Sequence, residues 1–196
     1  MTCNTIPDIP LLRGPVPLSH LFIRRFTREG DRVVDATCGN GNDTLLLAEL
    51  VGCSGRVWAF DIQQQAIDQT IVRLSEAGLG DRVKTIHAGH ETLATHVTGA
   101  VSLIVFNLGY LPGGARSVVT RPETSLAALI QSLGIMKPGG ILVVTVYSGH
   151  DGAMDEQQIV EKWATGLDPR SFHAWRMGQT NVTSTAPYLL LVQRAA

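Results

Sequence analysis

The chain has 196 residues, with 16 basic and 17 acidic side chains and a formal net charge of −1. This length suffices for one α/β domain with a core, and the charge excludes a globally basic nucleic-acid binder. No apolar run is long enough to cross a bilayer, and no secretory signal is expected at the amino terminus. Three cysteines without metal-ligand spacing predict reduced thiols in a cytoplasmic protein that needs no metal.

Predicted strands and helices alternate along the chain after an extended arm over residues 1–16. Strands are expected at residues 32–36, 56–60, 83–87, 101–107, 140–147, 172–177 and 188–193. Helices are expected at residues 18–27, 43–51, 64–77, 91–96, 123–136 and 155–165. Continuous Val, Ile and Leu strands alternating with helices indicate a mostly parallel sheet that is covered on both faces. No helix separates the last two strands, so we predict a single Rossmann-like, doubly wound domain over residues 1–196 with an antiparallel final hairpin.

A glycine-containing turn joins the first strand to a helix. The strand ends in Asp35, the turn contains Gly39 and Gly41, and a helical pattern opens at Asp43 and Thr44. A strand, a tight turn and a helix N-terminus together form a cradle for a nucleotide-like ligand. Thr44 stands where a dinucleotide site has its third glycine, and a carboxylate before the turn repels phosphate but can orient an ammonium. The pattern favours S-adenosylmethionine, and the alternative is a plain strand-to-helix turn.

A second acid, Asp61, stands at the end of the next predicted strand. In nucleotide-binding βαβ units an acid about 20 residues beyond the glycines bonds the ribose hydroxyls. We therefore expect Asp61 to bind the adenosine ribose, and it can also cap the helix that follows. Cys38, within the turn, is interpreted as a packing residue in preference to a nucleophile.

A polar motif ends the fourth predicted strand, at the sheet edge where doubly wound folds bind their ligands. Asn107 closes the strand and Tyr110 follows it. This resembles the Asn-Pro-Pro-Tyr motif of amino-methyltransferases, with Leu108 and Gly109 in place of the prolines. The Asn107 side-chain oxygen and the Leu108 carbonyl can accept both N–H bonds of an amine and aim its lone pair, while Tyr110 can stack on a base. The alternative is a strand-end Asn before a turn, with Tyr110 only packing.

The central loop after this motif contains Arg116, Ser117, Thr120 and Arg121. Arginine suits bidentate contact with phosphate, and this loop adjoins the predicted reaction site. We interpret it as a substrate-binding segment, with solvated surface arginines as the alternative. A second group of arginines, at positions 24, 25, 28 and 32, has the same two interpretations.

Five segments stand in the order found in one known family. They are Asp35-Ala-Thr-Cys-Gly-Asn-Gly-Asn-Asp-Thr44, Phe60-Asp-Ile-Gln63, Phe106-Asn-Leu-Gly-Tyr-Leu-Pro-Gly-Gly114, Ser117-Val-Val-Thr-Arg-Pro-Glu-Thr124 and Tyr147-Ser-Gly-His150. Together they resemble the small bacterial class I methyltransferases catalogued as rRNA methylases, over residues 17–196. Characterised members of that family methylate the aminomethyl group of wobble 5-aminomethyl-2-thiouridine in tRNA. The resemblance implies a class I fold, S-adenosylmethionine as cofactor, S-adenosylhomocysteine as product, and RNA, the tRNA anticodon arm, as partner.

The motifs and the resemblance together define the expected site. The expected cofactor residues are Asp35, Thr37, Gly39, Asn40, Gly41, Asn42, Asp43, Thr44, Asp61, Gln63, His90 and Asn107. The expected catalytic residues are Asn107, Tyr110, Tyr147 and His150, and the substrate-binding residues are Leu108, Gly109, Arg116, Ser117, Thr120 and Arg121. We expect direct transfer to an amine that first loses a proton, with His150, or alternatively His90, passing that proton to solvent. A turn histidine that bonds only its own loop is the alternative for His150.

Other function classes stay open at this point. An rRNA, small-molecule or protein amine methyltransferase would share the chemistry but would not require tRNA. A non-catalytic protein that binds RNA or S-adenosylmethionine would release no S-adenosylhomocysteine, and a dehydrogenase would bind nicotinamide. Because the domain is small for gripping a tRNA arm, a homodimer is expected, and no membrane partner is expected.

Overall fold

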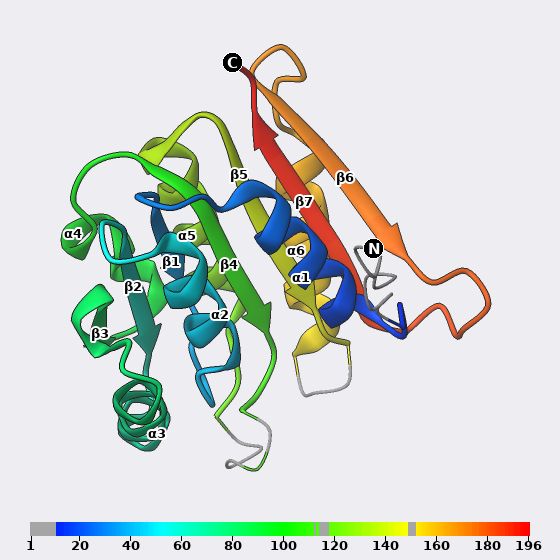
Figure 1. Ribbon diagram of the computed structural model, residues 1–196. Helices are drawn as coiled ribbons and strands as arrows, with labels where there is room; N and C mark the ends of the chain where they lie inside the picture. Colours follow the sequence, from blue (N-terminus) through cyan, green and yellow to red (C-terminus); the bar gives the residue numbers. More distant parts are fainter. Residues whose placement is uncertain (1–10, 112, 114–117, 149–151) are drawn as a thin grey trace, which may run out of the picture.

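A seven-stranded sheet forms the centre of the computed structural model, which describes residues 11–111, 113, 118–148 and 152–196 (Figure 1). Across the sheet the strand order is β3-β2-β1-β4-β5-β7-β6. Neighbouring strands are parallel except β7, which runs antiparallel to both β5 and β6. The predicted fold class is therefore confirmed. The strands are β1 (Arg32–Asp35), β2 (Arg56–Asp61), β3 (Val83–His87), β4 (Val101–Leu108), β5 (Met136–Val146), β6 (Phe172–Gly178) and β7 (Tyr188–Arg194).

Helices cover both faces of this sheet. In Figure 1, α1 and α2 lie in front of the strands, and α5 and α6 lie behind them. Short 3-10 turns occur at Gly80–Arg82 and His90–Thr92. None of the helices in the described part of the chain combines the length and the apolar character of a membrane span. The helices are α1 (Pro15–Phe26), α2 (Asn42–Val51), α3 (Gln64–Glu76), α4 (Leu93–His96), α5 (Pro122–Ile135) and α6 (Ala153–Thr165).

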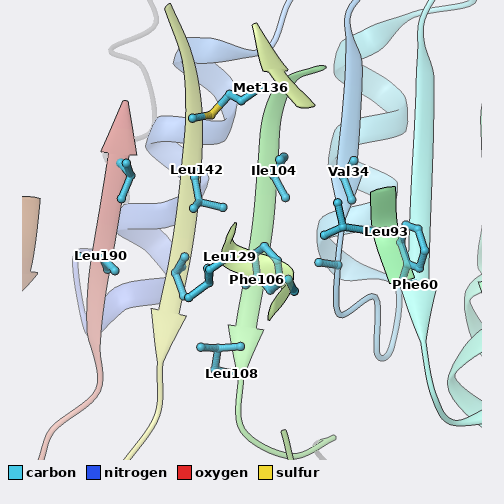
Figure 2. Close-up of a cluster of buried hydrophobic side chains, with 14 of the residues drawn as sticks. Val34, Phe60, Leu93, Ile104, Phe106, Leu108, Leu129, Met136, Leu142 and Leu190 are labelled. Atoms are coloured by element: carbon cyan, nitrogen blue, oxygen red, sulfur yellow. The ribbon is translucent and has the colours of Figure 1, made fainter. Parts of the chain in front are cut away.

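Successive side chains of β4 point to opposite faces of the sheet, which explains why helices cover both faces. Leu103 packs in the cluster under α1 and α2, while Ile104 and Phe106 pack in the opposite cluster under α4, α5 and α6. Figure 2 shows Ile104 and Phe106 beside Leu142 of β5 on that second face. Seven of the eight residues of β4 are buried, so this strand is covered on both faces, as expected for a parallel sheet. This central strand carries the predicted reaction motif at its carboxyl end.

Strand β5 begins earlier than predicted. The prediction ended a helix at residue 136 and began the strand at residue 140, but β5 begins at Met136, directly after α5, and includes residues 137–139. Val101 pairs with Met136 and Leu103 pairs with Ile141, so the register shifts where the glycines lie. Met136 is fully buried, and its burial together with strand pairing decides the conformation. Helix-stop residues cannot be distinguished from a bulged strand by local pattern alone.

Helix α1 also begins before the predicted position 18. Pro15 stands at its first position, where a missing backbone N–H costs nothing because the first N–H groups of a helix have no partner. Helix α1 packs against β4, β5, β7 and α2, and β4 lies next to β1 in the sheet. These two strands are neighbours at the point where the strand order reverses, which is the usual ligand position in open α/β sheets.

Candidate functional site

A cavity of about 900 Å³ opens at the carboxyl edge of the sheet. Its size is at the upper end for small-molecule sites, enough for a nucleoside-containing ligand and an acceptor group beside it. The walls come from α1, the β1–α2 turn, the ends of β2, β4 and β5, and the segment that leads into α5. Residues lining it include His20, Arg24, Thr37, Gly39, Asn40, Asn42, Asp43, Asp61, Gln63, His90, Asn107, Gly109, Tyr110, Thr120, Arg121 and Tyr147.

The carboxylate of Asp35 lies behind the glycine turn. Asp35 is fully buried, and its Oδ2 accepts a hydrogen bond of 2.6 Å from the Thr44 hydroxyl. Its Oδ1 accepts a hydrogen bond of 3.3 Å from the Thr37 N–H, which ties the turn to helix α2. Burial, and secondarily the nearby Asp43 charge, raises the pKa of Asp35. Asp35, Gly41 and Thr44 are not among the described residues that line the cavity, so their direct contact with a ligand stays a prediction.

Asp61 links the glycine turn to the loop after β2. Its Oδ2 accepts a 3.0 Å hydrogen bond from the Gly39 N–H, and its Oδ1 accepts a 2.9 Å bond from the Gln63 N–H. Asp61 is half-buried and lines the cavity together with both of these partners. A carboxylate has about four lone-pair positions, so two remain for ligand hydroxyls. Asp61 is thus oriented before any ligand arrives.

The backbone conformation of the turn requires glycine. Gly41 has a φ of +78°, and a Cβ there would lie 2.9 Å from the Thr70 hydroxyl. Thr70 in turn donates a 3.1 Å hydrogen bond to the Gly39 carbonyl. Burial raises the pKa of the adjacent Cys38 thiol, which keeps it protonated and fits a packing role.

Arg73 of α3 supports the turn from the outside, a role that sequence reasoning did not predict. Its guanidinium donates to the Asn40 carbonyl and, at 2.7 Å, to the Asn42 side-chain oxygen. Both asparagines line the cavity, as expected for cofactor residues. An arginine on an amphipathic helix ordinarily faces solvent, so no local signal marked this contact.

Asp43 connects α1 to the end of β4. Its side chain is 10% exposed, and Oδ1 lies 2.7 Å from the His20 Nε2 atom. Its Oδ2 accepts a 2.8 Å hydrogen bond from the Asn107 side-chain amide. The Asn107 backbone N–H donates to the Thr37 hydroxyl at 2.7 Å. The expected residues Thr37, Asp43 and Asn107 are therefore brought together, and His20 joins them although sequence reasoning did not select it.

His90 lies deep in the cavity wall, packed edge-on against Phe106 with ring centroids 5.6 Å apart. Burial lowers the pKa of His90, so its imidazole is neutral near pH 7. Its buried Nε2 has no hydrogen-bond partner within the described residues. A buried polar atom without a partner is costly unless a ligand or water completes it. His90 therefore fits contact with the polar edge of a nucleobase.

Part of the cavity wall comes from the carboxyl end of β4 and from the residues that follow β4 and β5. Tyr110 is 41% exposed, Tyr147 is half-buried, and both line the cavity. Burial, then the charge of Asp43, raises the pKa of Tyr147, which keeps its phenol neutral. The Leu108 carbonyl already accepts the Tyr147 N–H at 3.2 Å, and Leu108 does not line the cavity within the described residues. Its proposed contact with an amine stays a prediction.

Glu156 of α6 holds the segment before α5 in place. This buried carboxylate accepts hydrogen bonds from the Thr120 hydroxyl at 2.7 Å and from the Ser125 hydroxyl at 2.5 Å. The Thr120 N–H also donates to the Gly109 carbonyl at 2.9 Å. Thr120 thus joins two walls of the cavity. Three expected residues, Arg116, Ser117 and His150, lie outside the described residues.

Most of the chain matches a known protein family. Residues 57–193 match the family model described as "Putative rRNA methylase". The chain belongs to this family. The family resemblance inferred from the five sequence segments is confirmed.

Individual relatives agree with this assignment. The chain is 40% identical over 161 residues to the chloroplastic tRNA (mnm(5)s(2)U34)-methyltransferase of Arabidopsis thaliana, a match of 76% of this chain and 58% of that protein. The chain thus spans just over half the length of that relative. A Clostridium thermocellum structure named as an rRNA methylase is 40% identical, with a TM-score of 0.91 over 94% of this chain and 100% of that one. A Streptococcus mutans "putative methyltransferase" in complex with SAH is 34% identical, with a TM-score of 0.85 over 94% and 99%.

Proposed function

We propose that this chain is a single-domain, S-adenosylmethionine-dependent N-methyltransferase acting on RNA. Its proposed acceptor is the aminomethyl group of wobble 5-aminomethyl-2-thiouridine in tRNA. The observation that carries this proposal is that one cavity is lined both by the carboxylate of Asp61, which two backbone N–H groups hold in place, and by the side-chain amide of Asn107, whose nitrogen donates to Asp43. Family membership and the tRNA methyltransferase relative support it.

The cavity residues fit this cofactor. The free lone pairs of Asp61 suit ribose hydroxyls, and the unpartnered His90 nitrogen suits the edge of adenine. Asn40 and Asn42, at the start of α2, suit the methionine part of the ligand. When bound, S-adenosylmethionine supplies a sulfonium methyl group, which forms a bond to the amine nitrogen as its bond to sulfur breaks and S-adenosylhomocysteine leaves.

Asn107 orients the acceptor in this proposal. Its amide nitrogen is bound to Asp43, so its oxygen accepts an N–H of the incoming amine and aims the lone pair. An alkylamine is mostly protonated near pH 7, with a pKa near that of lysine, about 10.4. Enclosure beside the neutral phenol of Tyr147 favours the uncharged amine, because desolvation lowers an amine pKa. Transfer of the released proton by His150 is part of the proposal.

RNA contacts are proposed at the rim. Arg24 of α1 and Arg121 before α5 both line the cavity and have no ion pair or side-chain hydrogen bond within the described residues. Exposed guanidiniums without a partner among the described residues suit phosphates, and the exposed ring of Tyr110 suits stacking on a base. We propose the anticodon arm as the RNA element, a homodimer as the assembly and the cytoplasm as the location.

The deciding experiment incubates the protein with labelled S-adenosylmethionine and tRNA from cells lacking this gene, followed by nucleoside mass spectrometry. The expected result is the gain of one methyl group on aminomethyl-thiouridine. Total rRNA and free alkylamines are tested in parallel. Binding of S-adenosylhomocysteine without methyl transfer to this tRNA would refute the acceptor, and transfer to rRNA or a free amine would identify the alternative.

A further inference from the structure

We propose that His20 is a positioning residue for the reacting amine, acting on Asn107 through Asp43. This inference rests on the proposed function for its catalytic meaning. The contacts themselves form a chain from α1 to the end of β4: the His20 Nε2 atom lies 2.7 Å from Asp43, and the Asn107 amide nitrogen donates to the other oxygen of Asp43 at 2.8 Å. All three residues line the cavity.

The carboxylate determines which way the Asn107 amide faces. An ionised carboxylate only accepts hydrogen bonds, so the NH2 group of Asn107 must point toward Asp43. The amide oxygen is then on the opposite side, and it accepts no side-chain or backbone hydrogen bond within the described residues. A free acceptor oxygen in the cavity wall is what an amine N–H requires.

Among the described residues, Asp43 is the one hydrogen-bond partner that sets this orientation. The other polar contact of Asn107 is the bond from its backbone N–H to the Thr37 hydroxyl, which positions the main chain but leaves the amide free to flip. The Asp43 carboxylate can itself rotate about its terminal torsion, because such torsions have broad energy wells. A second partner on Oδ1 is therefore needed to hold Oδ2 toward Asn107.

His20 supplies that partner from a rigid element. Helix α1 packs on the sheet through the fully buried Ile23, one turn from His20, and contacts β5 and β7. His20 is one-third exposed on the cavity side, so its N–H reaches Asp43 without being deeply desolvated. Because α1 is distant in sequence from the turn and from β4, this helix closes the site by its position in the fold.

The test compares His20→Leu, which removes the N–H donor, with His20→Gln, which keeps a donor at similar reach. His173→Leu is the matched control, because His173 lies exposed on β6, away from the cavity. We expect His20→Leu to lower kcat for tRNA methylation about 10- to 100-fold, the scale of a misplaced reacting group, with the Kd for S-adenosylhomocysteine unchanged within about twofold. His20→Gln is expected to recover most of kcat, and His173→Leu to equal wild type.

A second readout does not depend on turnover. The side-chain amide resonances of Asn107 in a ¹⁵N-labelled protein are assigned by their loss in Asn107→Ala. We expect these resonances to shift in His20→Leu and to return toward wild type in His20→Gln. Should His20→Leu not fold, His20→Ala takes its place, since alanine suits a helix interior.

The two readouts separate the failure of this inference from the failure of the proposed function. Wild-type protein that methylates no tRNA, with Asn107 resonances that still respond to His20, would refute the function but support the positioning. Unchanged resonances in His20→Leu, or a kcat equal to wild type in an active enzyme, would overturn the positioning. An equal loss of kcat in His20→Leu and His20→Gln would also overturn it, because the donor would then not be the relevant property.

Discussion

Replacing Asp61 with asparagine changes the glycine turn and the ligand site together, because one carboxylate serves both. In the structure its two oxygens accept separate backbone N–H groups, from Gly39 at 3.0 Å and from Gln63 at 2.9 Å. Asparagine has a single acceptor oxygen, so one of these N–H groups would face an NH2 group. The ribose hydroxyls would also lose the charged acceptor.

The substitution should change both the affinity for the ligand and the free energy of unfolding. Hydrogen bonds to charged groups contribute about 1.5–3 kcal/mol, so the Kd for S-adenosylhomocysteine should rise about 10- to 100-fold. The half-buried N–H that loses its acceptor should reduce the free energy of unfolding by about 1–2 kcal/mol.

Isothermal titration calorimetry measures the first quantity and urea unfolding the second. Asp68→Asn is the matched control, because Asp68 is an exposed acid on α3 whose contact is with Gln64. Its effect on unfolding should stay within about 0.5 kcal/mol, and its Kd should equal wild type. A Kd for Asp61→Asn within twofold of wild type would refute the assignment of Asp61 to the ligand.

Three further predictions follow from the same geometry. Asn107→Ala should reduce turnover at least about 100-fold while the Kd for S-adenosylhomocysteine stays near wild type, and equal turnover would contradict the role given to Asn107. Because burial lowers the pKa of His90, its contribution to stability is present above its unfolded pKa of about 6.5 and is lost as pH falls through the lower folded pKa. Urea unfolding from pH 7 to 5 should therefore show a smaller loss of stability in His90→Gln than in wild type, and an identical slope would exclude this explanation. Arg24→Ala and Arg121→Ala should each weaken tRNA binding and reduce the slope of log K against log salt by about one. Arg170→Ala should do neither, because Arg170 lies exposed between α6 and β6, pairs with Asp168 and is not among the described residues that line the cavity.

Local sequence patterns were sufficient for most of the fold. Apolar strands, helix periodicity and the missing helix before β7 each depend on neighbours in the chain, and six of the seven strands begin at the predicted residue. The exception is the start of β5, where pairing of Met136 with Val101 prevails over local helix-stop residues. Strand pairing is a contact between distant residues, so no local signal reveals it.

The sequence by itself determined the position of the glycine turn, of Asp61 and of the Asn107 motif. Each stands at or just beyond the end of an apolar strand, and such strand ends can be recognised in the sequence. Only the tertiary structure decided which other side chains hydrogen-bond to these segments and hold them in position. Asp35 is turned inward to Thr44, and Arg73, Glu156 and His20 reach the site from helices that are remote in sequence. Their approach depends on strand order and helix packing, since the side chains of a helix acquire partners only when the helix is placed against the sheet. Residue types and their spacing can be read from neighbouring positions in the chain. The distances between side chains in the site depend on how elements that are far apart in sequence pack together.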